Sequence, residues 1–195
     1  MRRLHRTARE SGFTLAELMI VLLVLAIVIS AITAVLLSSS RQTQTTSARA
    51  GAQGGARQAL SLMTTEVRQA GADPSIPPVG IVGIVSGDSI SVHVRADLDG
   101  NGTISTTEPS EDVTYRWDSG ARTLSRNPGT GASTLIGNVT QAQFTYFDDT
   151  NAAITALPLS ATDAARVKSI GMSFTVSERG AQPVTLTTRV NLRNR

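Results

Sequence analysis

The chain has 195 residues, of which 41% are hydrophobic and only 4% aromatic, a composition that fits one membrane anchor and one modest domain better than a large enzyme. It contains no cysteine, which excludes a lipoprotein anchor, a disulfide framework and thiolate metal sites. Its formal net charge of +3 arises within residues 1–12, where Arg2, Arg3, Arg6 and Arg9 oppose only Glu10 (4 − 1 = +3). Positive flanks stay in the cytoplasm, so these arginines predict the orientation of the anchor. The remainder carries 14 basic and 14 acidic residues (18 − 4 and 15 − 1), and its neutrality argues against a nucleic-acid-binding protein.

The segment from Phe13 to Leu37 is apolar all round and contains neither proline nor glycine, which predicts a membrane-spanning helix. It is long enough to cross a hydrocarbon layer of about 30 Å, whereas a secretory signal peptide has an apolar region of only about 7–15 residues. Glu17 is the single charged residue in this run, and an ionised side chain in hydrocarbon costs roughly 2.5 kcal/mol or more. A plain signal anchor explains the span but not the carboxylate, so Glu17 is expected to have a partner.

The residues around Glu17 suggest that partner. Gly12, Phe13, Thr14, Leu15 and Glu17, followed by the long apolar helix, resemble the N-terminus of type IV prepilins and type II secretion pseudopilins. The resemblance implies that residues 1–12 are a leader, which a prepilin peptidase removes by cutting between Gly12 and Phe13. It also implies N-methylation of the new Phe13 amine, and pairing of Glu17 with that amine on a neighbouring subunit during fibre assembly. Residues 13–37 would then be the transmembrane and assembly helix.

Residues 38–72 are predicted to continue the helix outside the membrane. Leu60, Met63, Val67 and Ala70 recur at spacings of three and four and form one helical face, whereas Glu66 lies off this stripe. We expect the stripe to pack on the domain that follows; a contact with neighbouring helices in a fibre is the alternative. Helix propensity is weak between residues 38 and 55, where fraying or a bend is plausible.

Residues 73–195 are predicted to form a β-rich head. Apolar and polar residues alternate in several segments, which predicts strands at 90–95, 113–117, 123–126, 139–147, 166–176 and 184–192. The turn Asp118–Gly120 predicts a hairpin between the second and third of these. The expected fold class is α+β and type IV pilin-like, with the long N-terminal helix packed on an antiparallel sheet.

A weaker resemblance concerns the kind of subunit. The stretches Ala59–Gly71, Val113–Arg126 and Val190–Asn194 are similar to those of PilW-type minor pilins and the J-type minor pseudopilin. The resemblance implies a minor rather than a major subunit.

One segment predicts a metal site. Asp97, Asp99, Asn101, Thr103, Ser105 and Glu108 fall at the ligand positions of a twelve-residue calcium loop, and Gly102 occupies its sharp turn. Strands flank the segment and Pro109 follows it, so we expect an EF-hand-like loop between two strands and not an EF-hand. The alternative is a solvated Asp/Asn/Gly turn. Bound Ca²⁺ would have a structural role.

The sequence offers no catalytic constellation, since His5 and His93 are its only histidines. It therefore predicts a structural subunit and not an enzyme. The resemblance implies that this subunit is a minor pilin of a type IV pilus, acting in priming or tip assembly. It would be a single-pass protein of the inner membrane, N-in and C-out, before entering a pilus or periplasmic pseudopilus. Its expected partners are other pilin subunits, prepilin peptidase and the inner-membrane assembly machinery. The alternatives are a minor pseudopilin of a type II secretion system and a pilus-presented adhesin or DNA-uptake module.

Overall fold

A computed structural model describes residues 12–107, 110–178 and 182–193. Its main helix, α1 (Leu15–Gln69), is continuous and does not break in the segment of weak helix propensity before Gly55. The chain nevertheless divides into two compact units, Met1–Gln44 and Thr45–Arg195. In the first unit the apolar side chains of α1 are exposed, and α1 is the one described helix long and apolar enough to cross a membrane.

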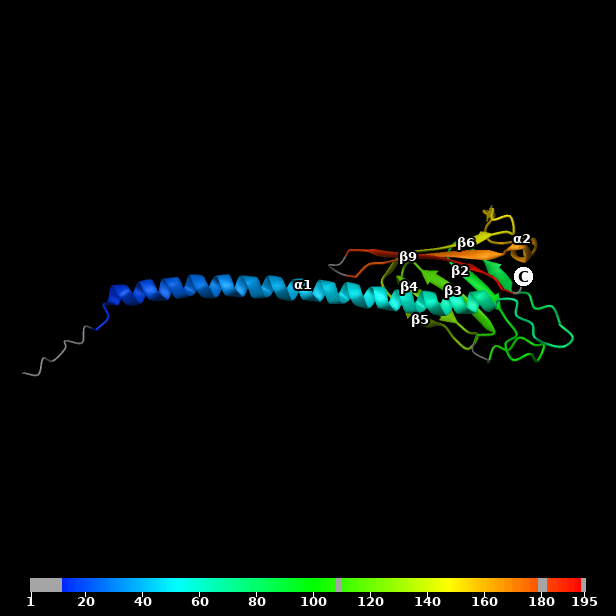
Figure 1. Cartoon of the computed structure of the whole chain (residues 1–195), viewed down its shortest axis with the longest axis horizontal. Helices are drawn as coiled ribbons and strands as arrows, with labels where there is room; N and C mark the ends of the chain where they lie inside the picture. Colours follow the sequence, from blue (N-terminus) through cyan, green and yellow to red (C-terminus); the bar gives the residue numbers. More distant parts are fainter. Residues whose placement is uncertain (1–11, 108–109, 179–181, 194–195) are drawn as a thin grey trace, which may run out of the picture. The chain divides into compact units, whose positions relative to one another are not determined.

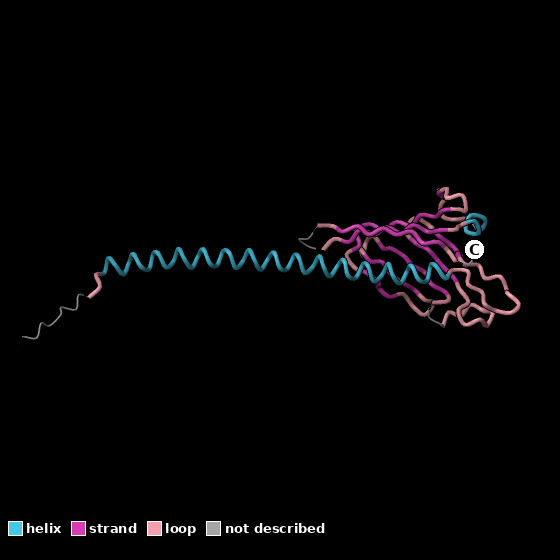
Figure 2. Tube along the Cα trace, in the orientation of Figure 1, coloured by secondary structure: helices cyan, strands magenta, loops and turns pink. Residues whose placement is uncertain are grey.

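The second unit contains the end of α1 and the head, whose strands form two antiparallel sheets (Figures 1 and 2). One sheet has the order β1-β2-β3-β4-β5, in which every strand pairs with its sequence neighbour. Its strands are β1 (Ile84–Gly87), β2 (Ser91–Arg95), β3 (Asp112–Asp118), β4 (Thr123–Asn127) and β5 (Ser133–Ile136). The other sheet has the order β7-β6-β8-β9. Its strands are β6 (Val139–Phe147), β7 (Ala153–Ile154), β8 (Ser169–Val176) and β9 (Val184–Asn191).

The core of this unit joins α1 to both sheets. The predicted stripe is buried, with Met63, Val67 and Ala70 fully inaccessible, and it belongs to one cluster with Tyr115 of β3 and Phe144 of β6. The expected packing of the helix on the head is therefore confirmed. The ring of Phe144 meets Phe174 of β8 edge to face, with centroids 6.0 Å apart.

Four elements were not expected from the sequence. β1, β5 and β7 have two to four residues, too few to display a clear alternation. The fourth is a short helix, α2 (Ala161–Arg166). Ser160 is its N-cap, and the Ser160 hydroxyl accepts a hydrogen bond from the Asp163 N–H. The predicted strand at 166–176 consequently begins later, at Ser169.

Candidate functional site

The N-terminal end of α1 holds the predicted processing and assembly residues. Gly12 and Phe13 precede the helix and are exposed, Phe13 by 89%. Glu17 accepts hydrogen bonds from the backbone N–H and the hydroxyl of Thr14, both at 2.9 Å, and its own N–H donates to the Thr14 hydroxyl at 3.3 Å. This reciprocal arrangement is a capping box, in which two helix-end donors are satisfied together. Sequence reasoning missed it, although Thr14 and Glu17 have the required spacing. The leader arginines Arg2, Arg3, Arg6 and Arg9 lie outside the described residues.

The predicted metal loop is organised around Asp97, which is fully buried. One of its carboxylate oxygens accepts from the Gly100 N–H at 2.8 Å and the other from the Gly102 N–H at 2.9 Å. Both glycines have φ near +78°, a conformation that favours glycine, so the tight turn expected at Gly102 is present. The Asp97 N–H donates to the Ala72 carbonyl at 2.9 Å, which attaches the loop just beyond the end of α1.

A third carboxylate completes the cluster, and it is not the one expected. Oxygen atoms of Asp97, Asp99 and Glu111 lie within 4.8 Å of one another, and Glu111 is only 1% exposed. Its oxygens accept from the Leu98 N–H at 2.9 Å and the Ser105 N–H at 3.0 Å, so the side chain folds back onto the loop. Glu108 lies outside the described residues. The twelve-residue pattern assigned the last ligand position to Glu108, and only the three-dimensional path of the chain brings Glu111 to the cluster.

The other predicted ligands among the described residues form hydrogen bonds within the loop. Asn101 accepts a hydrogen bond from the Thr103 N–H at 2.7 Å and donates to Asp99 at 2.6 Å, while the Ser105 hydroxyl lies 2.8 Å from that of Thr107. These bonds hold the oxygen atoms on one loop. A cation bound there would meet at least three carboxylates, which are the ligands that hard cations prefer.

The loop after α1 packs against the metal loop, where Pro74 lies next to Gly100 and Ser75 next to Gly102. Asp73 accepts hydrogen bonds from the Ser75 hydroxyl and from the Gly80 N–H, the latter at 2.6 Å. The Ser75 hydrogen bond is the main reason that the pKa of Asp73 lies below its usual value.

Glu66 departs from its expected position. Although it lies off the predicted stripe, it is only 4% exposed and faces Arg126 of β4. The Arg126 Nη2 donates to the Glu66 Oε1 at 2.5 Å, Ser110 donates to the same oxygen at 2.7 Å, and the Tyr115 hydroxyl donates to Oε2. Burial, and then the hydrogen bond to Glu66, raises the pKa of Tyr115, so this hydroxyl stays protonated. The ion pair between Glu66 and Arg126 thus attaches α1 to the five-stranded sheet, and each buried charge is neutralised by the other.

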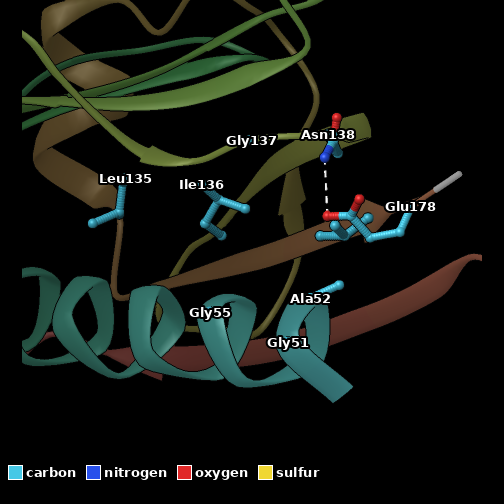
Figure 3. A pocket seen from close by; sticks show the side chains of 9 residues that line it. Gly51, Ala52, Gly55, Leu135, Ile136, Gly137, Asn138 and Glu178 are labelled. Carbon is cyan, nitrogen blue, oxygen red and sulfur yellow. Dashed lines mark hydrogen bonds between the residues drawn. The ribbon is translucent and has the colours of Figure 1, made fainter. Parts of the chain in front are cut away.

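A shallow groove of about 240 Å³ runs between α1 and the β5–β6 connection (Figure 3). Gly51, Ala52 and Gly55 form its helical wall, and Leu135 and Ile136 lie across from them. At one end the Asn138 side-chain amide donates to Glu178 at 2.9 Å. The helical wall consists of glycine and alanine, which have no polar side-chain atoms, so we do not assign a binding or catalytic site to this groove.

Comparison with known families matches one model, the prokaryotic N-terminal methylation motif, over residues 7–33. The chain carries a prepilin-type N-terminal motif. This match is consistent with the type IV pilin and pseudopilin family, whose members are structural subunits and not enzymes. No curated protein matches the chain. The long helix and antiparallel sheets agree with a type IV pilin-like fold, and the apolar helix fits a membrane-anchored pilin.

Proposed function

We propose that the chain is a minor pilin of a type IV pilus, a structural subunit that is processed by prepilin peptidase, is N-methylated and polymerises through its N-terminal helix. The observation that carries this proposal is the prepilin-type motif, in which Gly12 precedes an apolar run, Phe13 to Leu37, whose single charged residue is Glu17. The weaker resemblance to minor subunits favours a role in priming or tip assembly. The second candidate, a minor pseudopilin of a type II secretion system, rests on the same motif.

In this proposal Glu17 acts twice. Before assembly it caps its own helix, because the backbone N–H and the hydroxyl of Thr14 both donate to its carboxylate. During assembly the Phe13 amine of a neighbouring subunit pairs with it, and each group relieves the cost of roughly 2.5 kcal/mol or more that the other would bear alone in hydrocarbon. The leader arginines set the N-in, C-out topology in the inner membrane before assembly.

Intact-mass measurement of the subunit purified from membranes tests the processing step. The expected species begins at Phe13 and carries one additional methyl group, while Gly12→Val should retain residues 1–12. A wild-type chain that keeps its leader in cells with active prepilin peptidase would contradict the proposal.

Variants at Glu17 test the assembly step. Glu17→Ala should insert and be cleaved but fail to enter fibres, and Glu10→Ala, which alters only the leader, should behave as wild type. Glu17→Gln is the decisive variant, because glutamine keeps the capping box but removes the charge. Normal incorporation of Glu17→Gln would show that capping, and not charge pairing, is the role of this residue.

We further propose that the acidic loop binds Ca²⁺ and that the ion orders the head without taking part in chemistry. The support is the convergence of Asp97, Asp99 and Glu111, which could hold a metal, on a loop whose sequence follows the calcium pattern. Asn101, Thr103, Ser105 and Glu108 would supply the remaining oxygens. A ligand at 100 times its Kd stabilises a fold by about 2.7 kcal/mol, so the unfolding midpoint should rise with Ca²⁺ and fall with a chelator. An identical midpoint in both solutions would count against binding.

A further inference from the structure

A cleft lined by three arginines lies beside the C-terminal end of α1. The Arg193 N–H donates to the Arg68 carbonyl at 3.1 Å, which joins the segment after β9 to the last turn of the helix. The cleft has a volume of about 640 Å³ and is lined by Arg68, Arg189, Asn191, Leu192 and Arg193. All three arginines are exposed, so their guanidinium groups are accessible to a ligand.

This cleft contains three arginines that form no salt bridge within the described part of the chain. No described acidic residue lines it. The C-terminal end of α1 contributes only about half a negative charge against these three positive charges. Arg189 also lines an adjoining cleft together with Lys168, Asp148 and Asp149. Asp148 is already paired with Arg166 at 3.0 Å, and no salt bridge between described residues joins Asp149 to Arg189.

Arg189 is held in place before any ligand arrives. Its Nε donates to the Ser169 hydroxyl at 2.8 Å, and its guanidinium carbon lies 3.6 Å from the centre of the Phe147 ring. Stacking on an aromatic ring and a fixed hydrogen bond reduce the side-chain freedom that binding would otherwise remove. The outer N–H groups of Arg189 have no hydrogen-bond partner among the described residues.

We propose that this cleft binds a polymer of phosphate groups, with Arg189 as the fixed contact and with Arg68 and Arg193 binding neighbouring phosphates. One guanidinium group can donate two parallel hydrogen bonds to two oxygens of the same phosphate. Three guanidinium groups line this cleft, and its volume is larger than that of a single phosphate group. Asn191 adds an amide donor. The neutral charge of the chain after residue 12 conceals this site, because opposite charges gather elsewhere on the head, as at Asp97, Asp99 and Glu111.

Fluorescence anisotropy with the full chain in detergent micelles tests the proposal. The probes are end-labelled inorganic polyphosphate and a labelled single-stranded oligonucleotide, with unlabelled polyglutamate as a carboxylate competitor. Counterion release amounts to about 0.7–0.9 per phosphate contact, so three arginines predict that the logarithm of the association constant falls by about 2–3 for each tenfold increase in salt. Binding of both probes supports general phosphate recognition, and binding of the oligonucleotide alone identifies a nucleic acid as the source of the phosphates.

Substitutions locate the site. Arg189→Gln and Arg193→Gln should each weaken binding by about tenfold or more and lower this salt dependence, per tenfold increase in salt, by about 0.7–0.9. Arg116→Gln, at an exposed arginine of the five-stranded sheet, is the matched control and should change neither. Unfolding midpoints equal to wild type establish that the variants are folded. Equal binding by all variants, no binding at low salt, or competition by polyglutamate as strong as that by polyphosphate would overturn the proposal.

Discussion

The buried pair between Glu66 and Arg126 gives the sharpest prediction of stability. Glu66→Gln keeps the shape of the side chain but leaves the Arg126 guanidinium, only 14% exposed, without a countercharge. Removing one partner of a buried ion pair costs about 3–5 kcal/mol. For a unit of this size each kcal/mol lowers the unfolding midpoint by about 2–4 °C, so we expect a decrease of about 6–20 °C.

Circular dichroism of the full chain in detergent, followed during heating, measures this decrease. Asp149→Asn, at an exposed carboxylate, is the matched control and should leave the midpoint unchanged. The combined variant Glu66→Leu/Arg126→Met/Tyr115→Phe replaces the buried polar groups together and should lose less stability than Glu66→Gln alone. If Glu66→Gln stayed within about 1 kcal/mol of wild type, the pair would not be what holds α1 to the sheet.

Three further predictions concern the head. The hydrogen bond from Thr150, followed by that from the Ala152 N–H, keeps the pKa of Asp148 below its usual value, so the ionised carboxylate stabilises the fold above about pH 4. The unfolding temperature should therefore decrease when the solution is acidified below about pH 4, and it should decrease less in Asp148→Asn. A midpoint that rose in acid would contradict this. Gly87→Ala would place a methyl carbon against the Tyr146 hydroxyl and should lower the free energy of unfolding by about 1–3 kcal/mol in chemical denaturation. Gly137→Ala, with open space around it, should leave that free energy unchanged. In calcium titrations, Glu111→Gln should abolish the increase in the unfolding midpoint that calcium causes. If Glu108→Gln abolished that increase and Glu111→Gln did not, the twelve-residue pattern would be favoured instead.

Patterns confined to one element were sufficient to predict that element. The stripe from Leu60 to Ala70 is buried as expected, the strand 139–147 has the observed bounds of β6, and the turn after Asp118 joins β3 to β4 in a hairpin. In each case the signal lies in the spacing of neighbouring residues, so no knowledge of the tertiary fold is needed.

Contacts between distant residues could not be predicted in this way. Glu66 is buried because Arg126, 60 positions later, neutralises it, and no local pattern on α1 reports that partner. Glu111 joins the acidic cluster because the chain after Ser105 turns back to begin β3, whereas a loop pattern counts residues only along the sequence. The three-arginine cleft likewise combines residues from α1 and the end of β9.

The nearest-neighbour order of the five-stranded sheet also bears on the sequence of folding events. Its strands can pair as successive hairpins, with little loss of loop entropy, as soon as each has been synthesised. Docking α1 before the β3–β4 hairpin has formed would bury the Glu66 carboxylate while Arg126 is not yet in place to neutralise it. We therefore expect the helix to dock only after the β3–β4 hairpin has formed. Pulsed hydrogen-exchange labelling during refolding checks this order, and protection of residues 56–70 ahead of β3 and β4 would refute it.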